Sequence, residues 1–303
     1  MVHAYDDRSF EVPGARPRPP GSDVVERLRD LATDAIGRPV PEAMGVYIFR
    51  PGDEGAALPR AVVQSVFEET YAASEEQLDD EFSPYDRASL LVCVLDHRRR
   101  LPAGALRIIM PSPVGLKTLN EIESLWQHPY RELFATMDIT YDPRHTWNLS
   151  TLAVAPDYRT PAFQGLITLA LTQAASLIAN RCDMLWWIAT IYMPVLRMIQ
   201  WKFHQPFNDF AGLDPLPHPD HDTSALPTRG YMGRPVWGRL PDWYGRLAEK
   251  DRVLYDIMVN GTGLEAAMRP ADWDGAADAV RRIMAVSDLR LTPRSPDAAP
   301  GSE

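Results

Sequence analysis

Apolar and polar positions alternate along the chain with two different periods, which predict helices and strands. Helical spacing of apolar residues marks the segments 23–37, 58–78, 119–137, 161–181 and 194–203. Short apolar runs bounded by turn residues predict strands at 45–53, 88–96, 104–110, 146–155, 183–192 and 206–212. Pro129 should interrupt the third helix, because proline lacks the amide hydrogen that a helix interior needs.

The order of these segments predicts a mixed α+β fold around one central sheet. The polar stretch HRRRLPA separates the strands 88–96 and 104–110 and predicts a hairpin with a basic tip. The strand 146–155, the helix 161–181 and the strand 183–192 form a strand–helix–strand unit. Strands joined in this way run parallel, so we expect these two to be neighbours.

The composition and periodicity of the sequence divide the chain into four parts. Residues 22–240 carry the predicted sheet and form the main domain. Residues 241–287 hold two helix-like segments, which predict a C-terminal helical extension. Residues 1–21 and 288–303 are rich in Pro, Gly, Asp and Ser without periodicity, so we expect both ends to be disordered.

Composition narrows the classes of function. No apolar run approaches the ~18 residues of a membrane span, and the N-terminus lacks the apolar segment of a secretory signal. We therefore expect a cytoplasmic protein without a membrane partner. The net charge of −10 argues against nucleic-acid binding, which needs a basic surface. The two cysteines, Cys93 and Cys182, lie in apolar context and predict free thiols.

The sequence contains none of the motifs of several common enzyme classes. There is no phosphate-binding loop of the GxxxxGKT type, no dinucleotide fingerprint, no GxSxG turn and no zinc-spaced Cys/His set. The cluster HPDHD (218–222) lies in a proline-rich segment without spaced partners, so we expect no metal.

The stretch TLAVAPDYRTPAFQG (151–165) joins a predicted strand to a predicted helix. Thr160 suits the cap of that helix and Pro161 its first position, while Arg159 adds a positive charge. Free N–H groups and the helix dipole could then hold a phosphate. The alternative is a capped helix without a ligand.

Three passages resemble, in their order and spacing, the GNAT superfamily of acyltransferases. The likeness is to the branch of acyl-homoserine-lactone synthases and N-acyl amino acid synthases, and it covers about residues 45–210. RAVVQSVFEETYA followed by DDEFSPYDRASLLVCVLD is similar to the helix, acidic loop and strand of that branch. GALRIIMPS is similar to its Gly-x-x-Arg-Leu strand, and WNLSTLAV to its Trp-Glu-x-Ser-Arg-x-x-Val strand.

The resemblance implies an N-acyltransferase that moves an acyl group from a pantetheine thioester to the amine of a small molecule. The co-substrate would be acyl-CoA or an acyl carrier protein, without a metal. The sheet would be mostly antiparallel, with the strands 146–155 and 183–192 splayed around the pantetheine arm. The residues implied in donor binding lie at the end of the first of these strands and in the turn after it: Leu152, Ala153, Val154, Arg159, Thr160, Ala162 and Gly165. A backbone N–H near Leu152 would stabilise the oxyanion.

The sequence also departs from that branch. Asn148 stands where the branch carries Glu, and Thr151 where it carries Arg. An amide is no general base, so deprotonation would run through water. Ala162 and Gln164 replace glycines of acyl-CoA enzymes, which favours a carrier-protein donor. These departures also suit an alternative function, a catalytically silent acyl-thioester or ligand-binding protein. Protein-lysine acetylation fits the sequence least well.

The resemblance implies further site residues. On the acceptor side they are Asp80, Asp86, Arg107 and Trp147, with the alternative that the acidic residues only solubilise a loop. Burying Arg107 on an apolar strand requires a carboxylate partner, for which Asp80 and Asp86 are the candidates.

The catalytic candidates are Asn148, Tyr192 and His204. Tyr192 could protonate the leaving thiolate and His204 could act as a general acid. Aromatic packing and an ordinary histidine are the alternatives. The residues expected to line an acyl chain, unless they are plain core, are Trp147, Trp186, Trp187, Met193, Leu196 and Trp201. The basic tip HRRR (97–100) is expected to be a solvated hairpin tip, with docking of an acidic carrier protein as the alternative.

Overall fold

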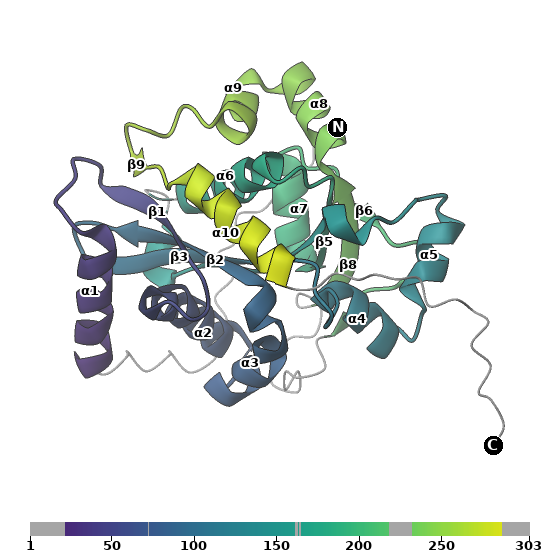
Figure 1. Cartoon of the computed structure of the whole chain (residues 1–303), viewed down its shortest axis with the longest axis horizontal. Helices are drawn as coiled ribbons and strands as arrows, with labels where there is room; N and C mark the ends of the chain where they lie inside the picture. Colours follow the sequence, from purple (N-terminus) through teal and green to yellow (C-terminus); the bar gives the residue numbers. More distant parts are fainter. Residues whose placement is uncertain (1–21, 72, 161–162, 164, 218–231, 287–303) are drawn as a thin grey trace, which may run out of the picture.

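The computed structural model describes residues 22–71, 73–160, 163, 165–217 and 232–286 (Figure 1). These residues form one nine-stranded sheet in the order β6-β8-β5-β4-β3-β2-β1-β9, with β7 paired to β8. The strands are β1 (Met44–Phe49), β2 (Ser89–Asp96), β3 (Leu101–Ile109), β4 (Thr146–Val154), β5 (Trp186–Tyr192), β6 (Asn208–Asp209), β7 (Leu216–Pro217), β8 (Met232–Arg239) and β9 (Met268–Arg269). All pairs are antiparallel except β4–β5 and β1–β9. The predicted mixed α+β fold is confirmed.

The helices cover both faces of the sheet. They are α1 (Ser22–Ile36), α2 (Ala57–Tyr71), α3 (Glu75–Phe82), α4 (Lys117–Ser124), α5 (Tyr130–Thr136), α6 (Leu166–Arg181), α7 (Met193–Lys202), α8 (Leu240–Lys250), α9 (Arg252–Tyr255) and α10 (Trp273–Val286). In the view of Figure 1, α1, α2 and α3 lie below the sheet, and α6 and α8 lie above it. The break between α4 and α5 confirms the predicted interruption at Pro129.

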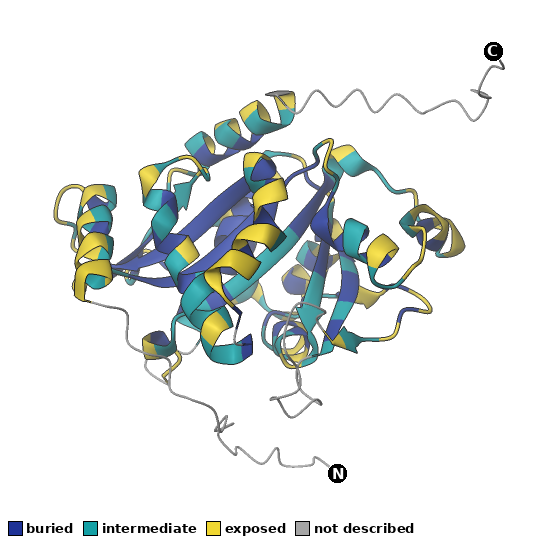
Figure 2. Cartoon of the chain, turned by 90° about the horizontal axis from the view of Figure 1, so that it is seen from below, coloured by how far each residue is buried: buried dark blue, intermediate teal, exposed yellow. Residues whose placement is uncertain are grey.

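The alternation of side chains along the central strands explains this two-sided packing. Val92 and Val94 of β2 belong to the core shared with α6, whereas Cys93 and Leu95 pack with α1 and α2. Every residue of β2 is buried, because both faces are covered. Figure 2 shows buried central strands beneath helices whose outer surfaces are exposed.

The segment after residue 240 shares the core of the main domain. β9 pairs with β1 at the edge of the sheet, and α10 contributes Ala276 and Val280 to the core on the α6 side. This arrangement encloses α6, which explains why its sequence LITLALTQAASLIANR is apolar on nearly every side. The C-terminal extension predicted from the sequence is thus packed against the sheet and α6.

The parallel pairing of β4 with β5 ends early. The two strands are adjacent and parallel, as predicted, but their register runs only from Thr146↔Trp186 to Asn148↔Ile188. Both strands continue beyond this point, and most of their later residues are only half-buried. The predicted divergence of the two strands is therefore confirmed.

One local prediction about the strand–helix turn is wrong. The helix begins at Leu166, and its capping position is Gly165 rather than Thr160. Gly165 has a φ of 89°, which a helix interior does not allow, so the helix cannot extend back through it. Residues 161, 162 and 164 lie outside the described residues.

Gly104 of β3 sets the distance between the sheet and α6. A Cβ atom on Gly104 would come within 2.3 Å of Ile167 Cγ2 and 3.2 Å of the Ala153 carbonyl oxygen. We predict that Gly104→Ala lowers the free energy of unfolding by about 1–3 kcal/mol, the cost of overpacking. Denaturant unfolding measures it, and Gly52→Ala is the control, since nothing lies within 4 Å of that position. Equal stability of the two variants would contradict the close packing.

Candidate active site

An apolar cavity of about 140 Å³ lies in the wedge between β4 and β5. We call it the wedge cavity. It is lined from both sides of the sheet, because Phe67 and Tyr71 come from α2 while Thr172 and Ala175 come from α6. The other lining residues are Val66, Leu106, Leu149, Ser150, Thr151, Leu152, Trp187, Ala189, Thr190, Ile191, Tyr192, Val195, Ile199, Gln205 and Phe207. The gap between the strands therefore forms an apolar slot that passes through the sheet.

The backbone of β4 is irregular where it lines this cavity. The β3–β4 register passes from Arg107↔Ser150 to Ala105↔Ala153, so Thr151 and Leu152 face the single residue Leu106. Thr151 has a φ of 50°, a strained value for a β-branched residue. Its Oγ1 is buried and has no hydrogen-bond partner in the described part of the chain. A bulge of this kind re-aims backbone groups next to a binding site.

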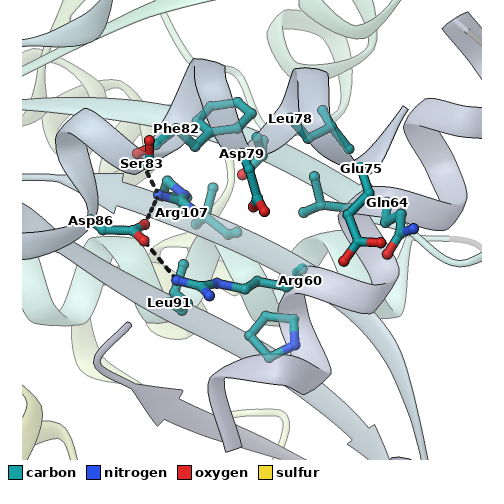
Figure 3. A pocket seen from close by; sticks show the side chains of 15 residues that line it. Arg60, Gln64, Glu75, Leu78, Asp79, Phe82, Ser83, Asp86, Leu91 and Arg107 are labelled. Atoms are coloured by element: carbon teal, nitrogen blue, oxygen red, sulfur yellow. Dashed lines mark hydrogen bonds and ion pairs between the residues drawn. The ribbon is translucent and has the colours of Figure 1, made fainter. Parts of the chain in front are cut away.

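A second cavity, also of about 140 Å³, lies between α2, α3 and the sheet (Figure 3). We call it the polar cavity. Its charged lining residues are Arg60, Glu75, Asp79, Asp86 and Arg107. In Figure 3, Asp79 extends from α3 into the space between Arg107 and Glu75. Leu106 and Thr151 line both cavities, so the polar and the apolar space meet at the bulge of β4.

Asp86 holds together the arginines of the polar cavity. Its Oδ1 accepts a hydrogen bond from Arg107 at 2.7 Å and its Oδ2 one from Arg60 at 2.8 Å. Arg107 is 6% exposed, stacks on the Phe82 ring at 4.8 Å and donates to the Phe82 carbonyl at 3.4 Å. Burial lowers the pKa of Arg107, and Asp86 opposes this effect. The predicted burial and pairing of Arg107 are confirmed, with Asp86 rather than Asp80 as its partner.

A buried ion cluster on α3 and α4 was not anticipated from the sequence. Lys117 contacts Glu81 at 2.7 Å and also contacts Glu121. All three side chains are at most 13% exposed. Burial opposes the charge of Lys117, but Glu121 and Glu81 outweigh it and raise its pKa. Lys117 also lies 5.3 Å from the Phe82 ring, the ring on which Arg107 stacks.

This cluster reaches the wedge cavity through Thr190 of β5. Thr190 Oγ1 donates to Glu121 Oε2 at 2.6 Å and lies 3.3 Å from Thr118 Oγ1. The sequence signal that could have revealed the cluster is the i,i+4 pair Lys117–Glu121 on an otherwise amphipathic helix. Such pairs are usually surface features, so the sequence alone gave no reason to select this one.

Tyr192 and Asn148 occupy different environments from each other. Tyr192 lines the wedge cavity and stacks on Tyr71 with ring centroids 4.9 Å apart. Burial raises the pKa of Tyr192, and so do Tyr71, Glu81 and Glu121, so its phenol is protonated at neutral pH. Asn148 is 1% exposed, and its Oδ1 accepts the Thr118 N–H at 2.5 Å. Asn148 therefore supplies a cap to the N-terminus of α4.

Several other predicted residues lie away from the cavities. Asp80 is exposed on α3 and is not among the residues that line the polar cavity. Trp147 is fully buried in the core on the α6 side. His204, with a φ of 51°, lies 3.9 Å from Asp251 at the end of α7. Of the predicted acyl-lining residues, Trp187 lines the wedge cavity, whereas Trp201 is 75% exposed.

The structure describes only part of the donor site that was predicted at the strand–helix turn. Leu152 lines the wedge cavity, Ala153 is buried behind it and Val154 is half-buried. Arg159 donates from Nε to the Val154 carbonyl at 2.9 Å and forms an ion pair with Glu69 at 3.0 Å. Ala162 and Gln164, like the cluster at 218–222, lie outside the described residues.

Metal and membrane sites are not seen in the part of the chain that the structure describes. No group of three or more His, Cys, Asp or Glu side chains there could hold a metal ion. None of the described helices has the length and apolar character of a transmembrane span.

Comparisons with known proteins add solved structures but no family model and no curated relative, since neither of those searches found a match. The chain is similar to FeeM, an N-acyl amino acid synthase from uncultured soil microbes, at 12% identity over 67% of this chain and 93% of that one, with a TM-score of 0.46. It is similar to the AHL synthase LasI at 16% identity over 73% and 96%, with a TM-score of 0.44.

A further similar structure is the CoA-dependent acyl-homoserine lactone synthase BjaI with MTA, at 14% identity over 78% of this chain and 99% of that one, with a TM-score of 0.46. These structures belong to the same branch that the sequence motifs resemble.

The two arginines bound to Asp86 provide a direct test of the geometry of the polar cavity. We predict that Asp86→Ala lowers the free energy of unfolding by about 3 kcal/mol, because it leaves the buried Arg107 without its carboxylate. Arg60→Ala should cost less than about 1 kcal/mol, since the Arg60 side chain is 42% exposed. Chemical denaturation of both variants makes the comparison. Equal losses would show that Arg107 does not depend on Asp86.

Proposed function

We propose that the protein is an N-acyltransferase that moves an acyl group from a pantetheine thioester to the amine of a small molecule. The observation that carries this proposal is the meeting of two unlike cavities at Leu106 and Thr151. An apolar slot suits an acyl chain and its thioester, and a polar space with carboxylates suits a charged amine. Their shared wall is where the two reactants would meet.

The donor would occupy the wedge cavity. The residues of β4 after Asn148 have no register partner on β5, so an extended pantetheine arm could bind there as an added strand. The backbone N–H of Leu152, a residue of the bulge, is the proposed oxyanion donor. Arg159, whose Nε donates to the carbonyl of Val154 at the end of β4, would contribute positive charge to a donor phosphate in competition with Glu69. Thr160 and Gly165 would complete that turn.

The acceptor would enter through the polar cavity. Asp86 is engaged by two arginines, whereas the exposed Asp79 and Glu75 remain to attract a cation. An ammonium group would thus meet negative charge at the rim before it reaches the wall formed by Leu106 and Thr151. Arg107 and Arg60 could bind a carboxylate of the same molecule, so an amino acid or a related natural-product intermediate fits this cavity.

The chemistry needs three contributions from the protein. The acceptor ammonium must lose a proton, because only the free amine has a lone pair for the thioester carbonyl carbon. The negative charge that develops on the carbonyl oxygen requires a donor. When the C–S bond breaks, the thiolate needs a proton, and the protonated Tyr192 beside the cavity is the proposed source.

The decisive experiment measures new small-molecule amide products by mass spectrometry. The purified protein is incubated with octanoyl-CoA or with an octanoyl-carrier protein, together with standard amino acids, their methyl esters and simple alkylamines. An amide above the level of a protein-free blank supports the proposal, and the better donor assigns CoA or carrier protein. Tight donor binding without amide formation or thioester hydrolysis would support the alternative, a catalytically silent binding protein, which the amide at Asn148 suits.

The rim carboxylate Asp79 should affect the acceptor alone. We predict that Asp79→Asn raises KM for the amine about fivefold, as for the loss of an exposed ionic contact worth roughly 1 kcal/mol, and leaves KM for the thioester unchanged. The effect should shrink at high salt because the contact is screened. The control is Glu76→Gln, an exposed carboxylate of the same helix that does not line the polar cavity. A similar change in both variants would argue against amine entry at Asp79.

A further inference from the structure

The two carboxylates of the buried ion cluster have different surroundings. Glu81 and Glu121 both contact Lys117. Glu121 in addition accepts the hydroxyl hydrogen of Thr190 at 2.6 Å, and Thr190 lines the wedge cavity. A continuous hydrogen-bonded path therefore connects the cavity surface to a buried carboxylate.

We propose that Glu121 is the proton acceptor for the incoming amine and that the hydroxyl group of Thr190 carries the proton to it. This inference rests on the proposed acyl transfer and supplies the base that Asn148 cannot provide. Thr190 lies two residues beyond Ile188, the last residue of β5 that pairs with β4, so it lies on the open edge of the wedge.

The proposed steps balance as follows. The ammonium gives a proton to Thr190 Oγ1 while the Thr190 hydroxyl proton moves to Glu121 Oε2. The free amine then forms the C–N bond at the thioester carbonyl carbon, and the C–S bond breaks. The second proton of the attacking nitrogen passes to the leaving sulfur, directly or by exchange through the Tyr192 hydroxyl. Glu121 returns its proton to solvent after the products leave, so one proton is released for each amide formed.

The titratable groups around Glu121 come from four elements packed together. Lys117 on the same helix contacts the Glu121 carboxylate, and Glu81 reaches Lys117 from α3. Tyr192 approaches from β5 and stacks on Tyr71 of α2. Two carboxylates share one ammonium group here, which leaves a negative charge next to Thr190. That charge favours the uptake of a proton from the cavity.

The strand residue Asn148 holds the residues of this path in position. Its side-chain oxygen accepts the Thr118 N–H at 2.5 Å, which fixes the first turn of α4 against β4. The hydroxyl group of Thr118 lies 3.3 Å from that of Thr190. Glycine at position 233 leaves room for the Thr190 methyl group, because a Cβ atom there would lie 3.1 Å from it. Asn148 is thus a positioning residue for Glu121 and Thr190.

The test is the pH dependence of kcat/KM for the amine that gives most product with the wild-type protein. Below the pKa of the amine, the wild-type profile should be flat across neutral pH, because Glu121 takes the proton. Glu121→Gln should lower kcat/KM at pH 7 by about 100-fold, at the lower end of what a positioned proton acceptor contributes. Its kcat/KM should rise about tenfold per pH unit, since only free amine then reacts.

Three further variants separate proton transfer from a structural role. Thr190→Val should reproduce the profile of Glu121→Gln, and Thr190→Ser, which keeps the hydroxyl group, should restore the flat one. Glu81→Gln also removes a carboxylate charge that contacts Lys117, but it leaves the hydrogen bond between Thr190 and Glu121 intact. The pH profile of this variant should therefore stay flat. Thr190→Val also keeps the test valid if Glu121→Gln fails to fold.

The outcomes distinguish this inference from the proposed function. If the wild-type protein forms no amide, the acyltransferase and its base fail together. If it forms amide and Glu121→Gln or Thr190→Val keeps the flat profile, only the inference is overturned. Equal changes in the pH profiles of Glu81→Gln and Glu121→Gln would also overturn it. Such a result would mean that the cluster acts through its total charge rather than through proton transfer to Glu121.

Discussion

The early end of the β4–β5 pairing is the constraint on which the candidate site depends. Each strand is held along its outer edge, β4 by β3 and β5 by β8, so the two can separate after Asn148 and Ile188 without leaving the sheet. Separation leaves polar backbone groups at the inner edges without strand partners, and buried backbone groups need partners. An extended ligand that hydrogen-bonds like a strand would satisfy this need, while the apolar walls accept its chain.

The charged residues on the α2 and α4 face explain how this opening could handle a polar reactant. The Phe82 ring contacts both Arg107 and Lys117. The arginine–carboxylate group of the polar cavity and the buried ion cluster therefore pack against the same aromatic side chain. Burying such groups is costly in desolvation and is seldom the most stable way to fill a core. Their presence beside the opening, rather than elsewhere in the sheet, favours a role in binding or proton transfer over a role in stability.

Sequence patterns predicted the parts of this structure that follow from local physics. The strand–helix–strand unit fixed the neighbours β4 and β5, and the buried Arg107 required a carboxylate. The start of α6 was misplaced because Thr160 and Pro161 resemble a helix start, whereas the positive φ of Gly165 decides the boundary. Ser74 and Gln77, which form a capping box, mark the start of α3 within a segment predicted as one helix. Glu81, Lys117 and Glu121 come together only through tertiary packing, which no local pattern reveals.

The lining of the wedge cavity decides how a proton could leave it. The Tyr192 phenol is protonated at neutral pH, and it hydrogen-bonds to Tyr71, another phenol, rather than to a carboxylate. The Thr172 hydroxyl donates to the Thr168 carbonyl within α6, and the Thr151 hydroxyl has no partner among the described residues. The Thr190 hydroxyl differs from these because its hydrogen bond ends on a carboxylate. In a slot whose walls are largely apolar, a proton would otherwise need a path through water, and water would also hydrolyse the thioester. A relay built from Thr190 and Glu121 lets the site deprotonate an amine while its apolar walls exclude water from the donor.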